Sequence, residues 1–270
     1  MFLLIDQGNS RCKYLLTEAL GDIKAVDSGS WENQDFDTAS WKGLLAPFQA
    51  KGIGRVLVSS VAGQARKEWF GALCHEVLGI WPEFAESGES YVSTSSVTLS
   101  NCYDTPQALG VDRWLAMIAV SERVTREFIV IDAGTAITTD WVNHKGQHQG
   151  GHIIPGGRML QQSLLGQTGG IAWSAKHDST AKGELLGENT SAAVALGAET
   201  MIKGYCYQVM KDVVNESSGK QLSVLVTGGD GPFVTECLQR VVEDMPLACR
   251  VEYQPNLVIE GLSHWFSLNN

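Results

Sequence analysis

Residues 6–13 include five that could form a site for a phosphorylated ligand, namely Asp6, Gly8, Asn9, Ser10 and Lys13. Gly8 lets the backbone approach a ligand closely, and turn N–H groups with short polar side chains can bind phosphate oxygens. An Asp carboxylate can hold Mg²⁺ through water, and a Lys ammonium is a point charge for phosphate oxygens. An ordinary hairpin with a charged tip would have the same composition, so these residues alone leave both interpretations open.

The residues on either side of this group predict how it is held. Residues 2–5 form a short apolar run that ends abruptly at Asp6, and strand-like composition resumes at residues 13–16. A short apolar run bounded by a Gly/Asn turn is typical of a buried strand. We therefore expect a hairpin whose polar tip carries the candidate phosphate ligands.

The same pattern occurs a second time in the chain. Residues 128–136 repeat residues 2–10 in order: an apolar strand, then Asp, any residue, Gly and a small polar residue. The repeat places Asp132 at the position of Asp6, with Thr135 at the second tip. An internal repeat indicates duplicated architecture, here two similar domains whose tips face one ligand. Coincidence is the alternative.

A second kind of chemistry is indicated at residues 110–113, Gly-Val-Asp-Arg, which precede an almost entirely apolar segment, residues 114–120. The apolar segment predicts a buried helix, and the N-terminus of a helix favours anions. Asp112 would stay ionised there, as a general base requires, and Arg113 offers a planar fork for a substrate carboxylate. A helix capped by Asp112 with a solvated Arg113 is the alternative.

Strands and helices alternate along the rest of the chain, which predicts an α/β protein. Residues 64–78 have the spacing of an amphipathic helix, and residues 192–214 form a longer helix that Thr190 or a neighbour should cap. A buried strand at residues 222–226 opens into two glycines, Gly228 and Gly229. Because a flat ring can lie on such a backbone, we predict the adenosine site there.

Composition and charge narrow the functional classes. The 270 residues are 44% hydrophobic and 19% charged, which is typical of a globular protein, and the net charge of −10 argues against a nucleic-acid surface. No apolar run approaches the roughly 20 residues needed to span a bilayer, and no secretory signal is visible. The six cysteines form no Cys-x-x-Cys pair, as in reduced thiols. We expect a cytoplasmic protein with no nucleic-acid or membrane partner.

Four motifs together resemble the type III pantothenate kinases: Asp6-x-Gly8-Asn9-Ser10-x-x-Lys13, Tyr103-x-x-Pro106-x-x-Leu109-Gly110-x-Asp112-Arg113, Asp132-x-Gly134-Thr135-Ala136-x-Thr138 and Gly150-Gly151-x-Ile153-x-Pro155-Gly156. Further matches at residues 189–190, 227–230 and 257–262 extend the resemblance over nearly the whole chain. It implies an α/β, actin-like fold of two ribonuclease-H-like domains around an ATP cleft, which we place at residues 1–121 and 122–270. It also implies transfer of the γ-phosphoryl group of ATP, bound with Mg²⁺, to the 4′-hydroxyl of pantothenate, the first step of coenzyme A synthesis.

The resemblance implies a role for each matching position. It places on ATP the residues Asp6, Gln7, Gly8, Asn9, Ser10, Arg11, Cys12, Lys13 and Thr135. It places on pantothenate the residues Tyr103, Gly110, Val111, Asp112, Arg113 and Thr190. Asp112 corresponds to the proton acceptor, and Asp132 to a ligand of a monovalent cation, K⁺ or NH₄⁺. The family pattern also implies a homodimer. Ser10 departs from the Thr that the family commonly has, but it keeps the hydroxyl.

Two other functions remain open at this point. A non-catalytic relative is one, because similar sequences have been described as accessory factors for transcription; the intact Asp6, Asp112, Arg113 and Asp132 argue against it. The other is a kinase of the same fold that acts on a sugar or acetate. Arg113 beside the base suits an alcohol that carries a carboxylate better than it suits a neutral sugar.

Overall fold

The computed structural model describes residues 1–32, 38–167, 185–217, 221–243, 245–246 and 248–268. The chain divides into two compact units. The first comprises Met1–Thr125, Lys145–Gly150 and Asn256–Asn270, and the second Arg126–His144 and Gly151–Pro255. These units differ from the domains predicted at residues 1–121 and 122–270, mainly because two later segments join the first unit. The last of them joins it because its helix packs on strands of the first sheet.

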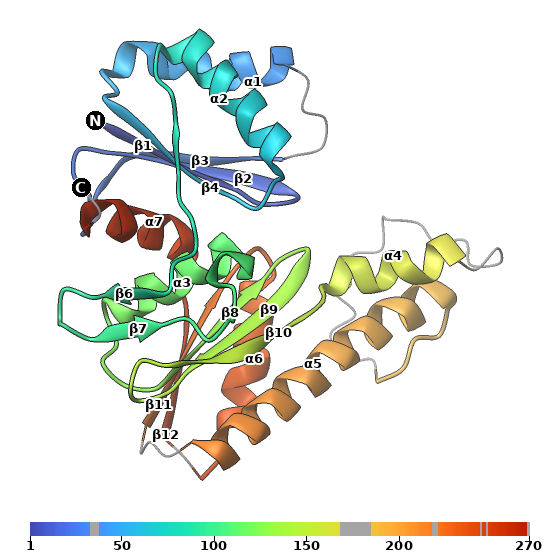
Figure 1. Ribbon diagram of the computed structural model, residues 1–270. Coiled ribbons are helices and arrows are strands. Elements are labelled where there is room, and N and C mark those ends of the chain that lie inside the picture. Colours follow the sequence, from blue (N-terminus) through green and yellow to red (C-terminus); the bar gives the residue numbers. More distant parts are fainter. Residues whose placement is uncertain (33–37, 168–184, 218–220, 244, 247, 269–270) are drawn as a thin grey trace. The chain divides into compact units, whose positions relative to one another are not determined.

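The sheet of the first unit has five strands in the order β3-β2-β1-β4-β5 (Figure 1). The strands are β1 (Phe2–Gln7), β2 (Arg11–Thr17), β3 (Ala25–Glu32), β4 (Arg55–Ser60) and β5 (Glu83–Phe84). β2 runs antiparallel to both β1 and β3, whereas β4 is parallel to β1 and β5 is parallel to β4. The predicted hairpin is therefore present, and its first strand is central in the sheet.

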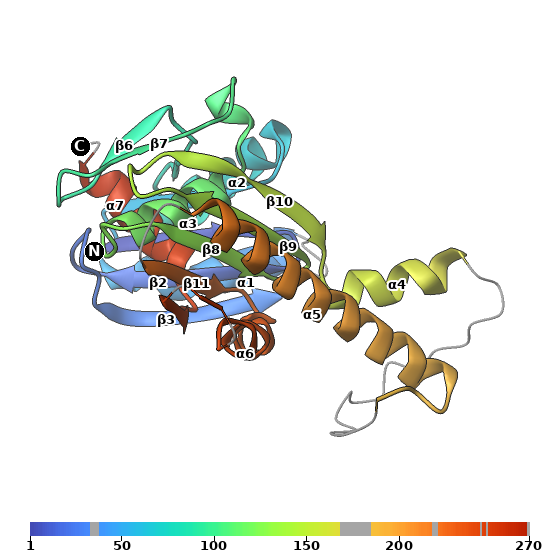
Figure 2. The same ribbon diagram turned by 90° about the horizontal axis from the view of Figure 1, so that it is seen from below.

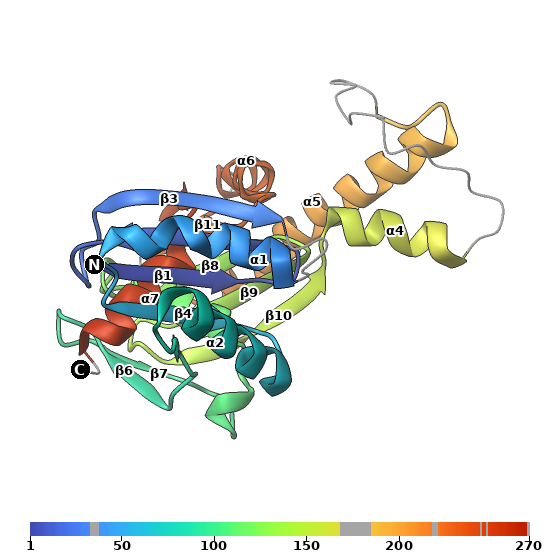
Figure 3. The same cartoon turned by 90° about the horizontal axis from the view of Figure 1, so that it is seen from above.

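Helices cover both faces of this first sheet. Helices α1 (Thr38–Leu45) and α2 (Gln64–Leu78) lie over one face, and α7 (Leu257–Leu268) packs against β1 and β4 (Figures 1 and 3). Leu3 and Ile5 of β1 enter the same buried cluster as Trp41, Phe70 and other apolar residues of α1 and α2. With both faces covered, β1 is apolar at consecutive positions, as the run at residues 2–5 predicted.

The sheet of the second unit repeats this plan, with five strands in the order β10-β9-β8-β11-β12. The strands are β8 (Phe128–Ala133), β9 (Ala136–Val142), β10 (His148–Pro155), β11 (Gln221–Thr227) and β12 (Ala248–Tyr253). β8 pairs with β9 antiparallel and with β11 parallel, and β11 pairs with β12 parallel. Each half of the chain thus builds a hairpin whose first strand is central and has a parallel neighbour on its other side.

The register of the two sheets extends the repeat beyond the motif itself. Asp6 lies opposite Lys13 on the antiparallel side and opposite Ser59 on the parallel side. Asp132 lies opposite Thr138 and Thr227 in the same way. A chance match of nine residues would not reproduce strand order, strand direction and register together. The predicted duplication of an α/β unit is therefore confirmed.

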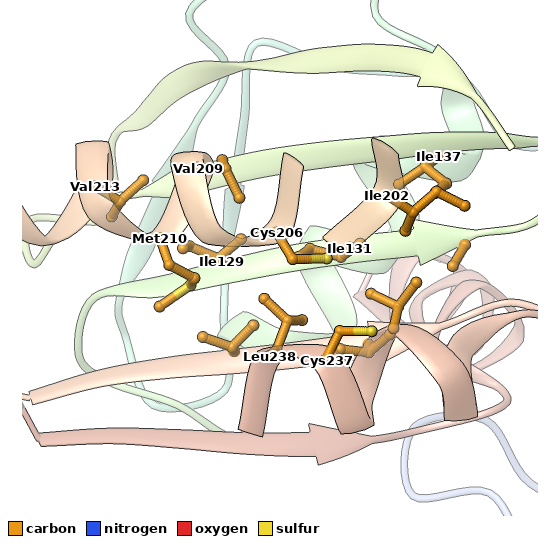
Figure 4. Close-up of a cluster of buried hydrophobic side chains, with 14 of the residues drawn as sticks. Ile129, Ile131, Ile137, Ile202, Cys206, Val209, Met210, Val213, Cys237 and Leu238 are labelled. Carbon is orange, nitrogen blue, oxygen red and sulfur yellow. The ribbon is translucent and has the colours of Figure 1, made fainter. Parts of the chain in front are cut away.

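The core of the second unit lies between its sheet and two helices, α5 (Thr190–Glu216) and α6 (Gly231–Val242) (Figures 2 and 4). The side of α5 that enters this core follows helical spacing, with Ile202, Cys206, Val209 and Val213. From β8, alternate residues point into the same cluster, as Figure 4 shows for Ile129 and Ile131. A further helix, α4 (Gly157–Gln167), lies beside α5 (Figure 2).

Helix α3 (Val111–Ser121) belongs to the first unit, and its residues 113–121 are all buried. This confirms the prediction of a buried helix. Helix α7 approaches α3 so closely that a Cβ atom at Gly261 would overlap the Leu115 carbonyl oxygen. Only glycine fits this contact between the two helices.

The other short elements belong to the first unit. They are the strands β6 (Ser90–Val92) and β7 (Thr98–Ser100), which pair antiparallel, and the 3₁₀ helices Ala46–Lys51 and Pro106–Ala108. In the part of the chain that the structure describes, no helix combines the length and the apolar character required to cross a membrane.

The close contact between α3 and α7 predicts an inverted effect of a glycine substitution. Ala normally favours a helix over Gly by up to about 1 kcal/mol. At Gly261, however, the added methyl group would overlap the α3 backbone, and overpacking costs about 1–3 kcal/mol, so Gly261→Ala should lower the free energy of unfolding. Gly197 in α5 is the matched control, because nothing lies within 4 Å of an added Cβ there. Gly197→Ala should leave stability unchanged or raise it. Urea unfolding of both variants measures the difference, and equal stabilities would contradict the prediction.

Candidate active site

The turn between β1 and β2 presents the first group of predicted phosphate ligands. The Gly8 N–H donates to the Arg11 carbonyl oxygen at 3.1 Å and closes the turn. Asn9, Ser10 and Arg11 are exposed at its tip, as ligand binding requires. A Cβ at Gly8 would lie 3.1 Å from the Arg11 carbonyl oxygen, so a larger residue would strain the turn.

Not every residue of this segment can offer its side chain to a ligand. The Cys12 side chain is fully buried in the core of the first unit. Burial, together with the nearby Asp6 charge, raises the pKa of the Cys12 thiol well above its ordinary value. The thiol therefore stays protonated, and any ligand contact at Cys12 has to come from its backbone.

A hollow of about 410 Å³ adjoins this turn within the first unit. Its lining combines the turn with α1 and with the connection from β4 to α2: Gln7, Gly8, Asn9, Trp41, Val61, Ala62, Gly63 and Arg66. The sequence pattern does not point to Trp41 or Arg66, because both are distant in the chain from the motif at residues 6–13. The small polar residues Ser59 and Ser60 at the end of β4 could have indicated this hollow. Because β4 is parallel to β1, they lie beside Asp6 and Gln7.

The second unit forms the corresponding turn between β8 and β9. The Gly134 N–H donates to the Ala136 carbonyl oxygen at 3.0 Å, and Thr135 is exposed at the tip. Gly156, just after β10, packs on this turn, since its N–H donates to the Thr135 carbonyl oxygen at 2.9 Å. A Cβ at Gly156 would overlap the Gly134 carbonyl oxygen. The glycine-rich motif therefore supports the turn that carries Thr135.

The loop after β11 packs on the other side of the same turn. Gly228 has a φ of +91°, and a Cβ there would lie 2.5 Å from an Asp132 carboxylate oxygen, Oδ1. The Asp230 N–H donates to the Ala133 carbonyl oxygen at 2.8 Å. The segment predicted to bind adenosine is thus in contact with the β8–β9 turn. Burial raises the pKa of the Asp230 carboxyl above its usual range, so the half-buried site penalises its charge.

The second predicted motif assembles around the N-terminus of α3. Asp112 accepts a hydrogen bond from the Arg113 N–H at 2.8 Å through Oδ1. A Cβ at Gly110 would lie 2.6 Å from that same oxygen, so glycine makes room for the carboxylate. Asp112 therefore lies in the first turn of the helix, where Gly110 is the N-cap residue and no side chain caps the helix. Val111 is buried beside it.

The Arg113 side chain is buried, contrary to the alternative in which it is solvated. It is only 6% exposed, and its Nη1 donates to the Tyr103 hydroxyl oxygen at 3.1 Å. The guanidinium carbon lies 5.9 Å from the centroid of the Tyr103 ring, within the range of a cation–π contact. Tyr103, Asp112 and Arg113, which were predicted to bind one substrate, are therefore brought together.

Two residues that sequence analysis did not select complete this cluster. The His148 ring is parallel to the Tyr103 ring within 8°, with 6.1 Å between the centroids. The His148 Nδ1 atom lies 3.4 Å from the Cys102 sulfur. No pattern near Tyr103 pointed to a histidine from the other half of the chain.

Thr190, the remaining predicted substrate ligand, is the exposed first residue of α5 in the second unit. Its neighbour Asn189 caps the helix, since the Asn189 side chain accepts from the Ala192 N–H at 3.0 Å. This confirms that Thr190 or a neighbour caps the helix. Among the described residues, no three or more His, Cys, Asp or Glu side chains gather as a metal-binding group would require.

Comparison with known proteins identifies relatives along nearly the whole chain. Residues 2–212 match the family model described as type III pantothenate kinase. A type III pantothenate kinase of Nitrosococcus oceani is 31% identical over 97% of this chain and 92% of its own length. One from Saccharophagus degradans is 28% identical over 98% of both chains.

Solved structures support the fold at much lower sequence identity. A putative Baf family transcriptional activator from Campylobacter jejuni superposes with a TM-score of 0.56 at 20% identity, over 99% of this chain and 98% of that one. The activator of 2-hydroxyisocaproyl-CoA dehydratase from Clostridium difficile, solved with bound ADPNP, has a TM-score of 0.55 at 11% identity, over 99% and 94%. With the duplicated sheet plan, these likenesses confirm the predicted actin-like fold.

Proposed function

This chain belongs to the type III pantothenate kinase family, and we propose that it transfers the γ-phosphoryl group of ATP to the 4′-hydroxyl of pantothenate, the first step of coenzyme A biosynthesis. The observation that carries the proposal for this chain is the cluster at the start of α3. There, the guanidinium of the buried Arg113 donates to the Tyr103 hydroxyl, and the Asp112 carboxylate accepts from the Arg113 backbone N–H.

The cluster suits a substrate that has both an alcohol and a carboxylate. Asp112 is the group we assign to orient the hydroxyl and accept its proton, since phosphoryl transfer depends mainly on positioning and charge stabilisation. Arg113 is the group we assign to the pantothenate carboxylate, which fits the planar fork of a guanidinium. Its burial supports this assignment, because a charge-assisted contact is stronger where water is excluded.

We assign ATP to the glycine turns. In the first unit these are residues 6–13, where Gly8 shapes the β1–β2 turn and Lys13 lies opposite Asp6. In the second unit they are the Thr135 turn and the Gly228 loop that packs on it. Mg²⁺ bound with ATP neutralises phosphate charge during transfer. Asp6 supplies an oxygen ligand of the kind Mg²⁺ prefers.

A sugar or acetate kinase and a transcriptional accessory protein are the competing functions. The likeness to the Campylobacter jejuni structure concerns the fold alone, because identity there is 20%. A neutral sugar gives Arg113 no carboxylate to bind, and acetate offers no alcohol to Asp112. Pantothenate is the substrate that uses both side chains.

We also assign a monovalent cation, K⁺ or NH₄⁺, to Asp132. The surroundings of this carboxylate fit a hard cation because they are rich in oxygen. Thr138 and Thr227 lie opposite Asp132 in the sheet, and the Gly228 backbone approaches its Oδ1. Carboxylate, hydroxyl and carbonyl oxygens are the ligands that such cations select.

We further propose a homodimer and a cytoplasmic location. Helices α4 and α5 expose several large apolar side chains: Met159, Leu164, Met201 and Tyr207. Apolar surface of this kind marks an interaction site, and most soluble oligomers are symmetric homo-oligomers. All six cysteines are free thiols, which suits a reducing compartment.

Substitution of Asp112 and Arg113 tests the placement of the two substrates. Asp112→Asn keeps the oxygen that accepts from the Arg113 N–H but removes the base. Turnover should therefore fall by about 10²- to 10⁴-fold while ATP binding persists. Arg113→Met keeps the base and removes a charge-assisted contact worth about 1.5–3 kcal/mol, so pantothenate affinity should fall roughly ten- to a hundredfold. ADP release with pantothenate, acetate and glucose in parallel measures both effects.

Asp104→Asn is the control for this pair, because Asp104 is an exposed carboxylate close to Tyr103 in sequence. It should leave turnover within about twofold. Wild-type turnover in Asp112→Asn would limit Asp112 to a structural role in the first turn of α3. If Arg113→Met binds ATP more weakly and pantothenate as before, Arg113 contacts ATP and the two substrates are assigned the wrong way round.

Replacement of the monovalent cation tests the role of Asp132. Activity at constant Mg²⁺ should fall strongly when Na⁺ or Li⁺ replaces K⁺, because the oxygen atoms around Asp132 would be too far apart to coordinate a smaller ion closely. Asp132→Asn should weaken the dependence on K⁺ concentration. Initial rates over a series of chloride salts give the result, and full activity in buffer free of K⁺ and NH₄⁺ would remove this role from Asp132.

Sedimentation tests the proposed assembly. The wild-type chain should sediment as a dimer at micromolar concentration, and Met201→Glu should shift it toward monomer because a charge would be placed in the apolar surface. Val92→Glu, an equally exposed apolar position on β6 of the first unit, is the matched control and should leave the dimer intact. A monomeric wild-type chain would refute the assembly.

A further inference from the structure

His148 lies in a segment whose position is determined by the first unit. Residues 145–150 belong to that unit although both neighbouring stretches of chain belong to the second. The Ser100 N–H donates to the Gly146 carbonyl oxygen at 2.9 Å, and Gln147 forms a parallel bridge with Ser100. Gly146 has a φ of +76°, and a Cβ there would overlap the Thr98 carbonyl oxygen. Backbone contacts therefore hold this segment against β7.

The held segment places a buried imidazole against the substrate cluster. The His148 side chain is 2% exposed, so it is packed on nearly all sides. One face of its ring is parallel to Tyr103, and its Nδ1 atom contacts the Cys102 sulfur. Two contacts from residues next to each other in sequence therefore constrain the orientation of the ring.

Tyr103 connects His148 to the guanidinium. Its hydroxyl oxygen accepts from Arg113 at 3.1 Å, and its ring lies beside the guanidinium carbon at 5.9 Å. The angle of the Tyr103 ring therefore helps to determine where the fork of Arg113 points. A guanidinium binds a carboxylate best through two parallel N–H···O bonds, so a change in the angle of its fork should weaken binding of the carboxylate.

We propose that His148 is a positioning residue for the substrate carboxylate, acting through Tyr103 and Arg113. This inference rests on the proposed function, in which Arg113 binds the carboxylate of pantothenate. His148 itself touches neither substrate. It confines the Tyr103 ring, and the confined ring presents the guanidinium at a fixed angle.

The test compares two substitutions at His148. His148→Ala removes both the ring face and the Nδ1 contact, and it should raise the KM and the calorimetric Kd for pantothenate about tenfold. The kcat and the KM for ATP should stay within about twofold. His148→Phe keeps a flat ring against Tyr103 and should restore most of the pantothenate affinity.

A double-mutant cycle shows whether the effect passes through Arg113. If His148 acts by orienting that guanidinium, His148→Ala should have no further effect on pantothenate affinity in the Arg113→Met background. His264→Phe is the matched control, because His264 is the other buried histidine among the described residues of the first unit and lies on α7. It should leave pantothenate affinity unchanged.

Each contrary outcome overturns the inference in a recognisable way. If His148→Ala binds pantothenate as tightly as the wild type while Arg113→Met binds it more weakly, His148 is a packing residue only. If His148→Ala loses affinity for pantothenate and ATP equally and also has a lower melting temperature, the role of His148 is generally structural. Additive effects in the cycle would exclude action through Arg113. A wild-type chain that does not phosphorylate pantothenate would refute the proposed function, and this inference with it.

Discussion

Burial of the central strands, β1 and β8, is the constraint on which the rest of the structure depends. Leu3, Leu4 and Ile5 are fully buried between the helices on the two faces of the first sheet, and Ile129 and Ile131 are fully buried against α5 and α6 in the second unit. Asp6 and Asp132 directly follow these buried runs and are half-buried, one residue before the end of each strand. The same burial that stabilises each sheet therefore places an acidic side chain at the edge of the core.

Close packing around these acidic side chains then requires glycine at particular positions. Gly156 and Gly228 lie against the β8–β9 turn so tightly that a Cβ at either would overlap a carbonyl oxygen. Gly110 makes the corresponding space for Asp112 at the start of α3. In all three cases the glycine backbone itself contacts the acidic or turn residue, and no space remains for a side chain at the glycine position. The glycine-rich motifs are therefore a consequence of packing, and the exposed turn is what the packing positions.

The sequence predicted the features that depend on local pattern. Apolar runs predicted β1, β8 and the buried α3, and the repeat predicted two similar units, because burial and periodicity are visible within a few residues. The burial of Arg113 was not predicted, since it depends on tertiary contacts such as the hydrogen bond to the Tyr103 hydroxyl. Trp41, Arg66 and His148 were missed for the same reason, because each reaches its site from a distant part of the chain. Cys12 shows the reverse case, a motif residue whose side chain faces the core.

The two hairpins share one plan but differ in the residue that lies opposite the Asp. Asp6 has a lysine, Lys13, as its antiparallel neighbour, whereas Asp132 has a threonine, Thr138, at the equivalent place. A carboxylate beside an ammonium forms a locally balanced pair suited to phosphate oxygens and their bound Mg²⁺. A carboxylate among hydroxyl and carbonyl oxygens keeps a net negative field, which attracts a cation. In the function we propose, this one cross-strand difference separates the tip assigned to phosphate from the tip assigned to a cation.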